Sequence, residues 1–174
     1  MTSLVGLVLD SGDVLIKYLE TSAETGGALH AQEGRYKAHS AFPPLHCHPA
    51  QDERFQMIEG GLEFRVDGAL RTVKAGDEIA IPRGAYHQAR NPFDEPAIVR
   101  WETRPALRTA ELYRDLYGAT ARHGGKRPPL HEAAAILREY RHEFRLAKPP
   151  ALVQRIVFSC LAPFGRGAVG PRVG

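Results

Sequence analysis

Cysteine is scarce in this chain, with only Cys47 and Cys160 among 174 residues. Two cysteines in separate regions cannot form the disulfide framework of a small secreted domain, so a reducing, cytoplasmic location is expected. No apolar run approaches the 18 residues of a membrane-spanning helix. The first residues carry no basic segment, and Asp10 and Asp13 interrupt their apolar run, so we expect no signal peptide.

A large excess of charge is also missing. Lys and Arg number 23 against 20 Asp and Glu, and this net charge of +3 is too small to predict a nucleic-acid-binding surface. The excess lies at the C-terminal end, because residues 148–174 include four basic residues and no acid. The length fits one domain whose core needs no metal to fold, so a bound metal would serve another purpose.

Short segments with period-two alternation follow one another from residue 14 to about residue 103. Leu62, Phe64 and Val66 alternate with charged residues, and this segment ends at Asp67 and Gly68, a strong hairpin signal. Further strands are expected at 35–42, 53–59, 70–74, 78–81, 86–90 and 97–102. This spacing predicts an antiparallel β-sandwich or β-barrel.

After Pro105 the apolar pattern becomes helical. Helices are expected at 107–117, ended by Gly118, at 130–144, and at 152–164. The last helix carries a broad apolar face made of Leu152, Val153, Ile156, Val157, Cys160, Leu161 and Phe164. We therefore divide the chain into a β-domain (1–105), a helical extension (106–165) and a Gly-rich, flexible tail (166–174).

The segment that follows residue 45 carries the first chemical signal. His46 and His48 lie two residues apart, so in a strand both side chains point to one face while Cys47 points away. A turn at Pro49 would let Glu53 begin a new strand that faces the same cavity. The sequence thus predicts two imidazoles and one carboxylate at a shared site.

A second signal lies about forty residues further on. Pro82 and Gly84 form a tight turn that places His87 on the next strand. Three imidazoles and one carboxylate suit one divalent Fe, Mn, Ni, Cu or Zn ion. The other histidines (His30, His39, His123, His131 and His142) are isolated in the sequence and are expected to be structural.

Apolar side chains are expected to line the cavity beside this site. Phe55 and Met57 share the face of Glu53, which favours a small organic substrate. Periodicity does not decide which face of the strand at 97–102 is internal. We place Trp101 toward the pocket, because an indole ring is easier to bury than its charged neighbours.

The two motifs together resemble those of the cupin superfamily. The first family motif is Gly-x5-His-x-His-x3–4-Glu-x6-Gly, and the second is Gly-x5-Pro-x-Gly-x2-His-x3-Asn. The matching positions here are His46, His48, Glu53 and Gly60, followed by Gly76, Pro82, Gly84, His87 and Asn91. Ser40 stands where the first motif begins with Gly. The resemblance covers roughly residues 28–105 and leaves the helical third outside.

The resemblance implies an antiparallel jelly-roll barrel in which His46, His48, Glu53 and His87 bind the metal. Four protein ligands leave one or two coordination positions for oxygen or a substrate atom. Cupins include oxygenases, decarboxylases, isomerases, polyketide cyclases and non-enzymatic proteins. The leading hypothesis is an oxygenase that acts on a small organic substrate, and the alternatives are a cyclase or isomerase that uses no oxygen and a non-catalytic ligand-binding protein.

The C-terminal apolar face leaves alternatives for the assembly of the protein. It suits packing on the barrel, packing on a second subunit, or an anionic membrane surface reached without any spanning segment. We expect packing and a homodimer, because such apolar faces in soluble proteins are usually covered.

Overall fold

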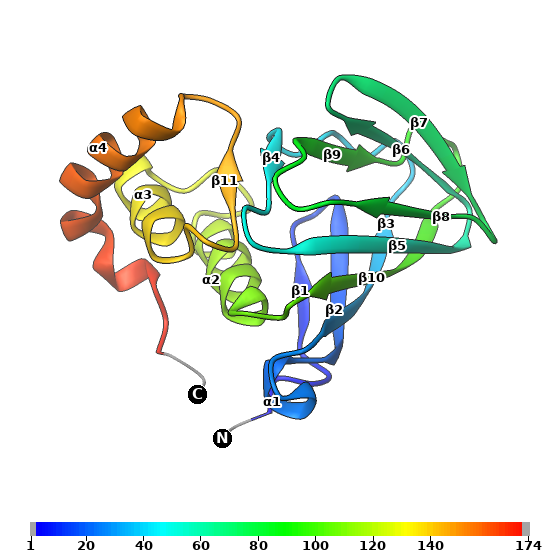
Figure 1. The fold of residues 1–174 in the computed structure, drawn as a ribbon, viewed down its shortest axis with the longest axis horizontal. Helices are drawn as coiled ribbons and strands as arrows, with labels where there is room; N and C mark the ends of the chain where they lie inside the picture. The colour runs from blue at the N-terminus through cyan, green and yellow to red at the C-terminus, as the bar shows by residue number, and fades with distance from the viewer. Residues whose placement is uncertain (1–2, 172–174) are drawn as a thin grey trace.

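The computed structural model describes residues 3–171 (Figure 1). The strands are β1 (Val8–Asp10), β2 (Val14–Glu20), β3 (His30–Tyr36), β4 (His46–Cys47), β5 (Asp52–Glu59), β6 (Gly61–Val66), β7 (Ala69–Lys74), β8 (Glu78–Ile81), β9 (His87–Arg90), β10 (Ala97–Arg104) and β11 (Arg145–Leu146). The helices are α1 (Ser22–Thr25), α2 (Thr109–Arg122), α3 (Leu130–Glu139), α4 (Ala151–Leu161) and the 3-10 segment Ala162–Ala168.

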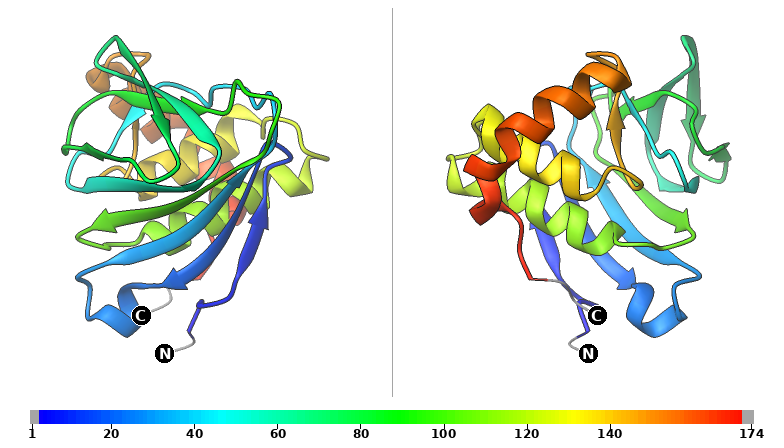
Figure 2. Two further views of the ribbon diagram at one scale, coloured as in Figure 1. Left: turned by 90° about the vertical axis from the view of Figure 1, so that its right-hand side faces the viewer. Right: turned by 60° about the vertical axis from the view of Figure 1, so that its left-hand side comes forward.

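Two antiparallel sheets form the β-domain. The six-stranded sheet has the order β1-β2-β3-β10-β5-β8, and the five-stranded sheet has the order β11-β4-β9-β6-β7. Helices α2, α3 and α4 gather at one side of the sheets, whereas α1 lies apart from them between β2 and β3 (Figures 1 and 2). The predicted jelly-roll fold with a helical extension is confirmed, although the sheets do not join into one closed ring of hydrogen-bonded strands across the described residues.

Strand β5 shows how the alternating sequence builds the interior. Phe55 and Met57 are buried in the main apolar core, whereas the alternating residues Arg54 and Gln56 are exposed. The hairpin between β6 and β7 turns at the expected Asp67 and Gly68, both with positive φ. The expected strand at 35–42 is wrong in its bounds: β3 begins at His30 and ends at Tyr36.

Two helix boundaries also differ from the expectation. Gly118 lies inside α2, which continues to Arg122, and the positive φ angles follow beyond the helix, at Gly124 (63°) and Gly125 (80°). Helix α3 ends at Glu139, so Phe144 is not on its apolar face but in the segment that leads into β11.

Helix α4 packs on only part of the predicted face, because Val157 and Leu161 are partly buried against the cluster of Ala134, Leu137 and Phe158. Gln154 and Phe158 are its buried residues, and Gln154 Nε2 donates to the carbonyls of Leu146 and Pro149, which fixes the rotation of the helix. The exposed apolar side chains at this end include Leu152, Val153, Ile156 and Phe164.

No helix in the described part of the chain is long and apolar enough to cross a membrane. The homodimer stays a prediction.

The helical extension starts within the core of the β-domain. Ala110 and Tyr113 of α2 belong to the main apolar cluster, and the Tyr18 hydroxyl donates to the Ala110 carbonyl at 2.6 Å. The far end is also packed: Ala168 is buried, and the backbone N–H of Gly170 donates to Asp115 at 3.0 Å. Residues 168–171 contact α2, while 172–174 lie outside the described residues, and the flexibility of the tail stays a prediction.

Candidate metal centre

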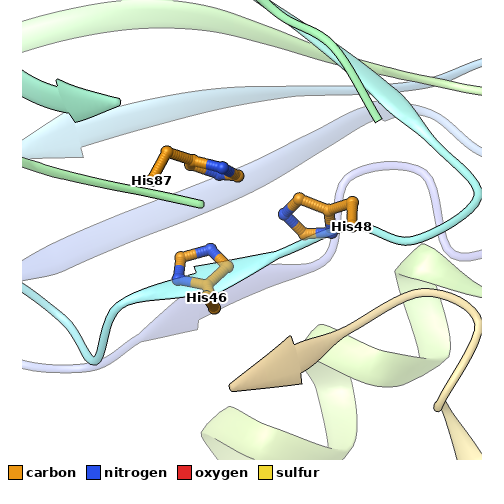
Figure 3. Close-up of side chains that lie close together, drawn as sticks. All are labelled: His46, His48 and His87. Carbon is orange, nitrogen blue, oxygen red and sulfur yellow. The ribbon is translucent and has the colours of Figure 1, made fainter. Parts of the chain in front are cut away.

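Three histidines meet inside the β-domain. His46 in β4 pairs in register with His87 in β9, and His48 follows β4 directly. One ligand atom from each imidazole lies within 4.8 Å of the other two (Figure 3). All three side chains are buried, with at most 8% exposed. The structure thus brings together three of the four predicted ligands as one compact nitrogen cluster.

Backbone carbonyls orient all three imidazoles. The Nδ1 atoms of His46, His48 and His87 lie 2.8, 2.6 and 3.0 Å from the carbonyl oxygens of Pro44, Glu143 and Ala85. A carbonyl oxygen only accepts, so each Nδ1 must carry the hydrogen. The Nε2 lone pairs are then free for a cation, which is the arrangement that metal-binding histidines need.

Glu53 at the start of β5 lies against two of the imidazoles. Its Oε1 is 3.2 Å from His48 Nε2, and its Oε2 is 2.9 Å from His87 Nε2. These contacts are not aligned as hydrogen bonds, since His48 Nε2 and Glu53 Oε2 are buried without a hydrogen-bond partner. Buried nitrogen and oxygen atoms that converge without forming hydrogen bonds are suited to bind a divalent cation. Glu53 lies outside the mutually close set of three histidines.

The electrostatics of the site also favour a cation. Burial lowers the pKa of His46 to about 3, and repulsion from the other two imidazoles acts in the same direction. Burial alone would raise the pKa of Glu53, but attraction to His48 and His87 lowers it to about 2. Burial alone would lower the pKa of His87, but its contact with Glu53 raises it. A proton on His87 therefore competes with a metal, and metal affinity should fall as the pH falls.

Trp101 supports the carboxylate from β10. Its indole Nε1 donates to Glu53 Oε1 at 2.8 Å, so its ring faces the interior, and it stacks on Phe55 at 5.1 Å between ring centroids. Phe55 and Met57 are almost fully buried in the same apolar cluster. The three residues expected to line a substrate pocket thus lie on the inner faces of β5 and β10, with Met57 further along β5 from Glu53 than Phe55.

Phe144 and Glu143 form part of the site although the sequence pattern gave no indication of it. The Phe144 ring stacks on His46, with ring centroids 4.5 Å apart and an angle of 15° between the planes. The Glu143 carbonyl accepts from His48 across 95 residues of sequence. We call residues 143–146 the covering segment, since β11 within it pairs with β4 and closes this side of the site. Its apolar periodicity placed Phe144 on a helix, which hid this contact.

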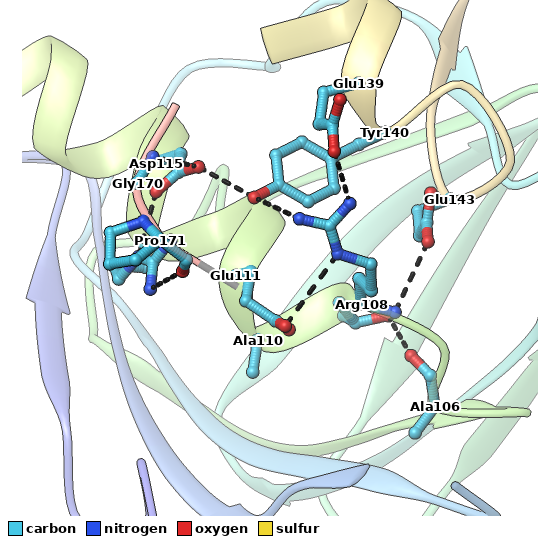
Figure 4. A network of polar contacts seen from close by, with 12 residues as sticks. Ala106, Arg108, Ala110, Glu111, Asp115, Glu139, Tyr140, Glu143, Gly170 and Pro171 are labelled. Carbon is cyan, nitrogen blue, oxygen red and sulfur yellow. Dashed lines mark hydrogen bonds and ion pairs between the residues drawn. The ribbon is translucent and has the colours of Figure 1, made fainter. Parts of the chain in front are cut away.

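A polar network holds the covering segment on the helices (Figure 4). The Arg108 side chain donates to Glu139 at 2.6 Å and lies over the Tyr140 ring, while its backbone N–H donates to the Glu143 carboxylate. Tyr140 in turn donates to Asp115 of α2 at 2.7 Å. These contacts connect α2 and α3 to the residue whose carbonyl orients His48.

Backbone constraints explain two positions of the first motif. Gly60 has φ of 68°, and a Cβ there would lie 2.6 Å from the Pro96 carbonyl oxygen, so only glycine fits. At the non-matching position, Ser40 is buried and its hydroxyl accepts from the Asn91 N–H at 2.8 Å. Serine therefore connects the start of the first motif with the end of the second.

Comparison with known proteins agrees with this fold. Residues 33–101 match the model of the cupin domain. The tetracenomycin polyketide synthase protein TcmJ of Streptomyces glaucescens is 31% identical over 67 residues, which is 38% of this chain and 45% of that protein. The chain thus matches less than half the length of this relative.

Solved structures show the same fold. An RmlC-like cupin from Shewanella frigidimarina superposes with a TM-score of 0.52 at 20% identity, covering 63% of this chain and 93% of that one. The Cnp3 cupin domain of Schizosaccharomyces pombe gives a TM-score of 0.51 at 18% identity, covering 71% and 80%. Residues 33–101 of the chain therefore form a cupin domain.

Cys47 offers a test of the strand register. Its Sγ accepts from Arg145 Nη2 at 3.5 Å, and it is not in the histidine cluster. Cys47→Ser should therefore leave the metal content unchanged, as measured by elemental analysis of the purified protein. A large loss of metal would mean that the sulfur contacts the ion.

Trp101→Phe tests the support of the carboxylate. Phenylalanine keeps a ring against Phe55 but removes the N–H that holds Glu53, so metal affinity should fall about 10- to 100-fold. Competition with a chelating indicator measures this change. An unchanged affinity would show that Glu53 is not a ligand or is held by other contacts.

Phe144→Ala tests the cover over the centre. Removing the ring that lies on His46 should speed the transfer of metal to an external chelator about tenfold, because the apolar shell controls access. Phe164→Ala removes an exposed ring elsewhere and should leave the rate unchanged. Equal rates in both variants and the parent protein would contradict a covering role.

Proposed function

We propose that the chain is a metal-dependent enzyme that acts on a small organic substrate, with dioxygen as co-substrate, at a centre formed by His46, His48, His87 and Glu53. The observation that carries this proposal is the set of three Nε2 atoms, each freed by a backbone carbonyl on its Nδ1, beside an ionised carboxylate. A divalent metal held there would supply a Lewis acid and a template for binding oxygen atoms.

The protein side chains would prepare this centre for catalysis. The carbonyls of Pro44, Ala85 and Glu143 hold the imidazoles in one tautomer, and Trp101 orients Glu53. The burial of these groups excludes bulk water, which strengthens electrostatic interactions with a bound substrate. Phe55, Met57 and Trp101 would offer apolar and aromatic contacts to an organic ring.

A second candidate is a metal-dependent cyclase or isomerase that consumes no oxygen. The observation in its favour is the 31% identity to a tetracenomycin polyketide synthase protein over 67 residues. Both candidates need the same ligands and the same apolar surroundings, so the role of dioxygen separates them. Binding without turnover would instead favour a ligand-binding protein.

The experiment compares metal-loaded protein with and without dioxygen. Hydroxylated naphthalenes and 1,3-diketones serve as candidate substrates, because their oxygen atoms can chelate a metal. Oxygen consumption in an electrode, matched by product in mass spectrometry and absent from His87→Ala, would support the oxygenase. Equal product formation under strict anaerobiosis would overturn it in favour of the cyclase or isomerase.

A further inference from the structure

A cavity of about 580 Å³ lies beside the metal centre, on the other side of the covering segment. It is bordered by the end of α3, by the residues that lead into β11, and by the first turns of α4, which are neighbours in Figures 1 and 2. Its size falls within the range of about 300 to 1,000 Å³ for small-molecule sites. None of the predicted ligands His46, His48, Glu53 and His87 lines it.

The charges around this cavity are all of one sign. Arg138, Arg141, Arg145 and Arg155 line it together with His142, and no acidic residue does so among the described residues. The sequence explains this composition, because no Asp or Glu follows Glu143. Arg138, Arg141 and Arg155 are exposed, so solvent screens their mutual repulsion, but the four guanidinium groups together give the cavity a positive potential that favours an anion.

These arginines also lack acidic partners within the chain. Arg138, Arg141 and Arg155 form no ion pair in the described part of the protein, and Arg141 donates only a long 3.5 Å bond to a carbonyl. Arg145 directs Nη2 to Cys47, and its buried Nε has no partner. Other arginines are paired, as Arg54, Arg83 and Arg108 show. Arg71 and Arg127 also form no ion pair among the described residues, so what distinguishes this cavity is that four arginines without acidic partners line it together.

The remaining wall of the cavity is apolar. Leu137 of α3, Phe144 of the covering segment and Phe158 of α4 line it. Ala151, the first residue of α4, lines it as well, and the N-terminal end of a helix adds positive potential. An occupant should therefore combine an anionic group with an apolar body.

We propose that this cavity binds an organic anion, in which a carboxylate or phosphate group contacts the arginines and an apolar or aromatic body lies on Leu137, Phe144 and Phe158. Guanidinium groups recognise both head groups through paired, charge-assisted hydrogen bonds. Phe144 forms a wall of the cavity and also stacks on His46, so one ring separates the two sites. The site does not depend on the proposed enzymatic function, because binding alone defines it.

Calorimetry on the full chain tests this site with four probes: 1-naphthoate, 1-naphthyl phosphate, neutral 1-naphthalenemethanol and inorganic phosphate. At least one of the naphthyl anions should bind at least about tenfold more tightly than both the neutral alcohol and inorganic phosphate. The tighter of the two anions identifies the preferred head group. Equal binding of the alcohol, or of inorganic phosphate alone, would overturn the proposal.

Variants place the binding in this cavity. Arg141→Gln and Arg155→Gln should each weaken the tighter anion about tenfold, whereas Arg71→Gln, an exposed arginine on β7, should have no effect. His87→Ala should bind the anion as tightly as the parent protein, which separates this cavity from the metal centre. Unchanged binding in both cavity variants, or its loss in His87→Ala, would contradict the assignment.

Discussion

Replacing His87 by alanine is expected to weaken metal binding by about 100-fold or more, because it removes one of three converging Nε2 atoms and also a contact of Glu53. His46 and His48 follow each other on one side of the site, whereas His87 comes from β9. Without His87, a bound metal would keep as ligands only His46 of β4, His48 directly after β4, and Glu53 of β5. The fold should persist, since the apolar core contains none of the predicted ligands.

Elemental analysis after exhaustive dialysis measures the metal, and circular dichroism checks the fold. His39→Ala is the matched control, because its imidazole is 65% exposed and pairs with Asp94 at the surface. The control should keep the metal content of the parent protein. Stoichiometric metal in a folded His87→Ala variant would disprove the ligand assignment.

The sequence predicted the nitrogen cluster from two local patterns, which the resemblance to the cupin motifs joined into one site. Strand parity places His46 and His48 on one side, and a tight turn with Gly84 at φ of 82° brings His87 onto β9. Short-range geometry of this kind is encoded by the spacing of a few residues. Such short-range geometry can therefore be predicted without knowledge of the rest of the fold.

The cover over the site could not be predicted in the same way. The contact of Phe144 with His46 and that of Glu143 with His48 join segments almost a hundred residues apart. Periodicity continued the helix through Phe144, but the chain leaves the helix after Glu139 and pairs with β4 instead. The pairing partner is a tertiary feature, which no local pattern records.

The packed face of α4 was mispredicted in part, for a related reason. Hydrophobicity alone selected Leu152 and Ile156, which are exposed, whereas the polar Gln154 is buried by its bonds to two carbonyls. A buried amide is stable only where such partners exist. Their position depends on the turn that precedes α4, which the sequence pattern does not specify.

Replacing Leu112 by alanine is expected to reduce the free energy of unfolding by about 2 to 5 kcal/mol, the range for a leucine removed from a packed core. Leu112 of α2 is fully buried and shares a cluster with Ile136 of α3 and with Tyr140, which directly follows α3. Helix α2 also packs on the barrel core through Ala110 and Tyr113, so the loss affects both parts of the chain. Denaturant unfolding followed by fluorescence measures the change.

The same substitution should weaken metal retention below the denaturation midpoint, because the α2–α3 contact supports the segment whose Glu143 carbonyl holds His48. Leu152→Ala is the control, since its side chain is 67% exposed and its stability should change by no more than about 0.5 kcal/mol. If Leu112→Ala unfolded in two steps, with the metal kept through the loss of the helices, the extension would be an independent unit. A single transition that releases the metal as the helices unfold is expected, because the main core contains residues of α2.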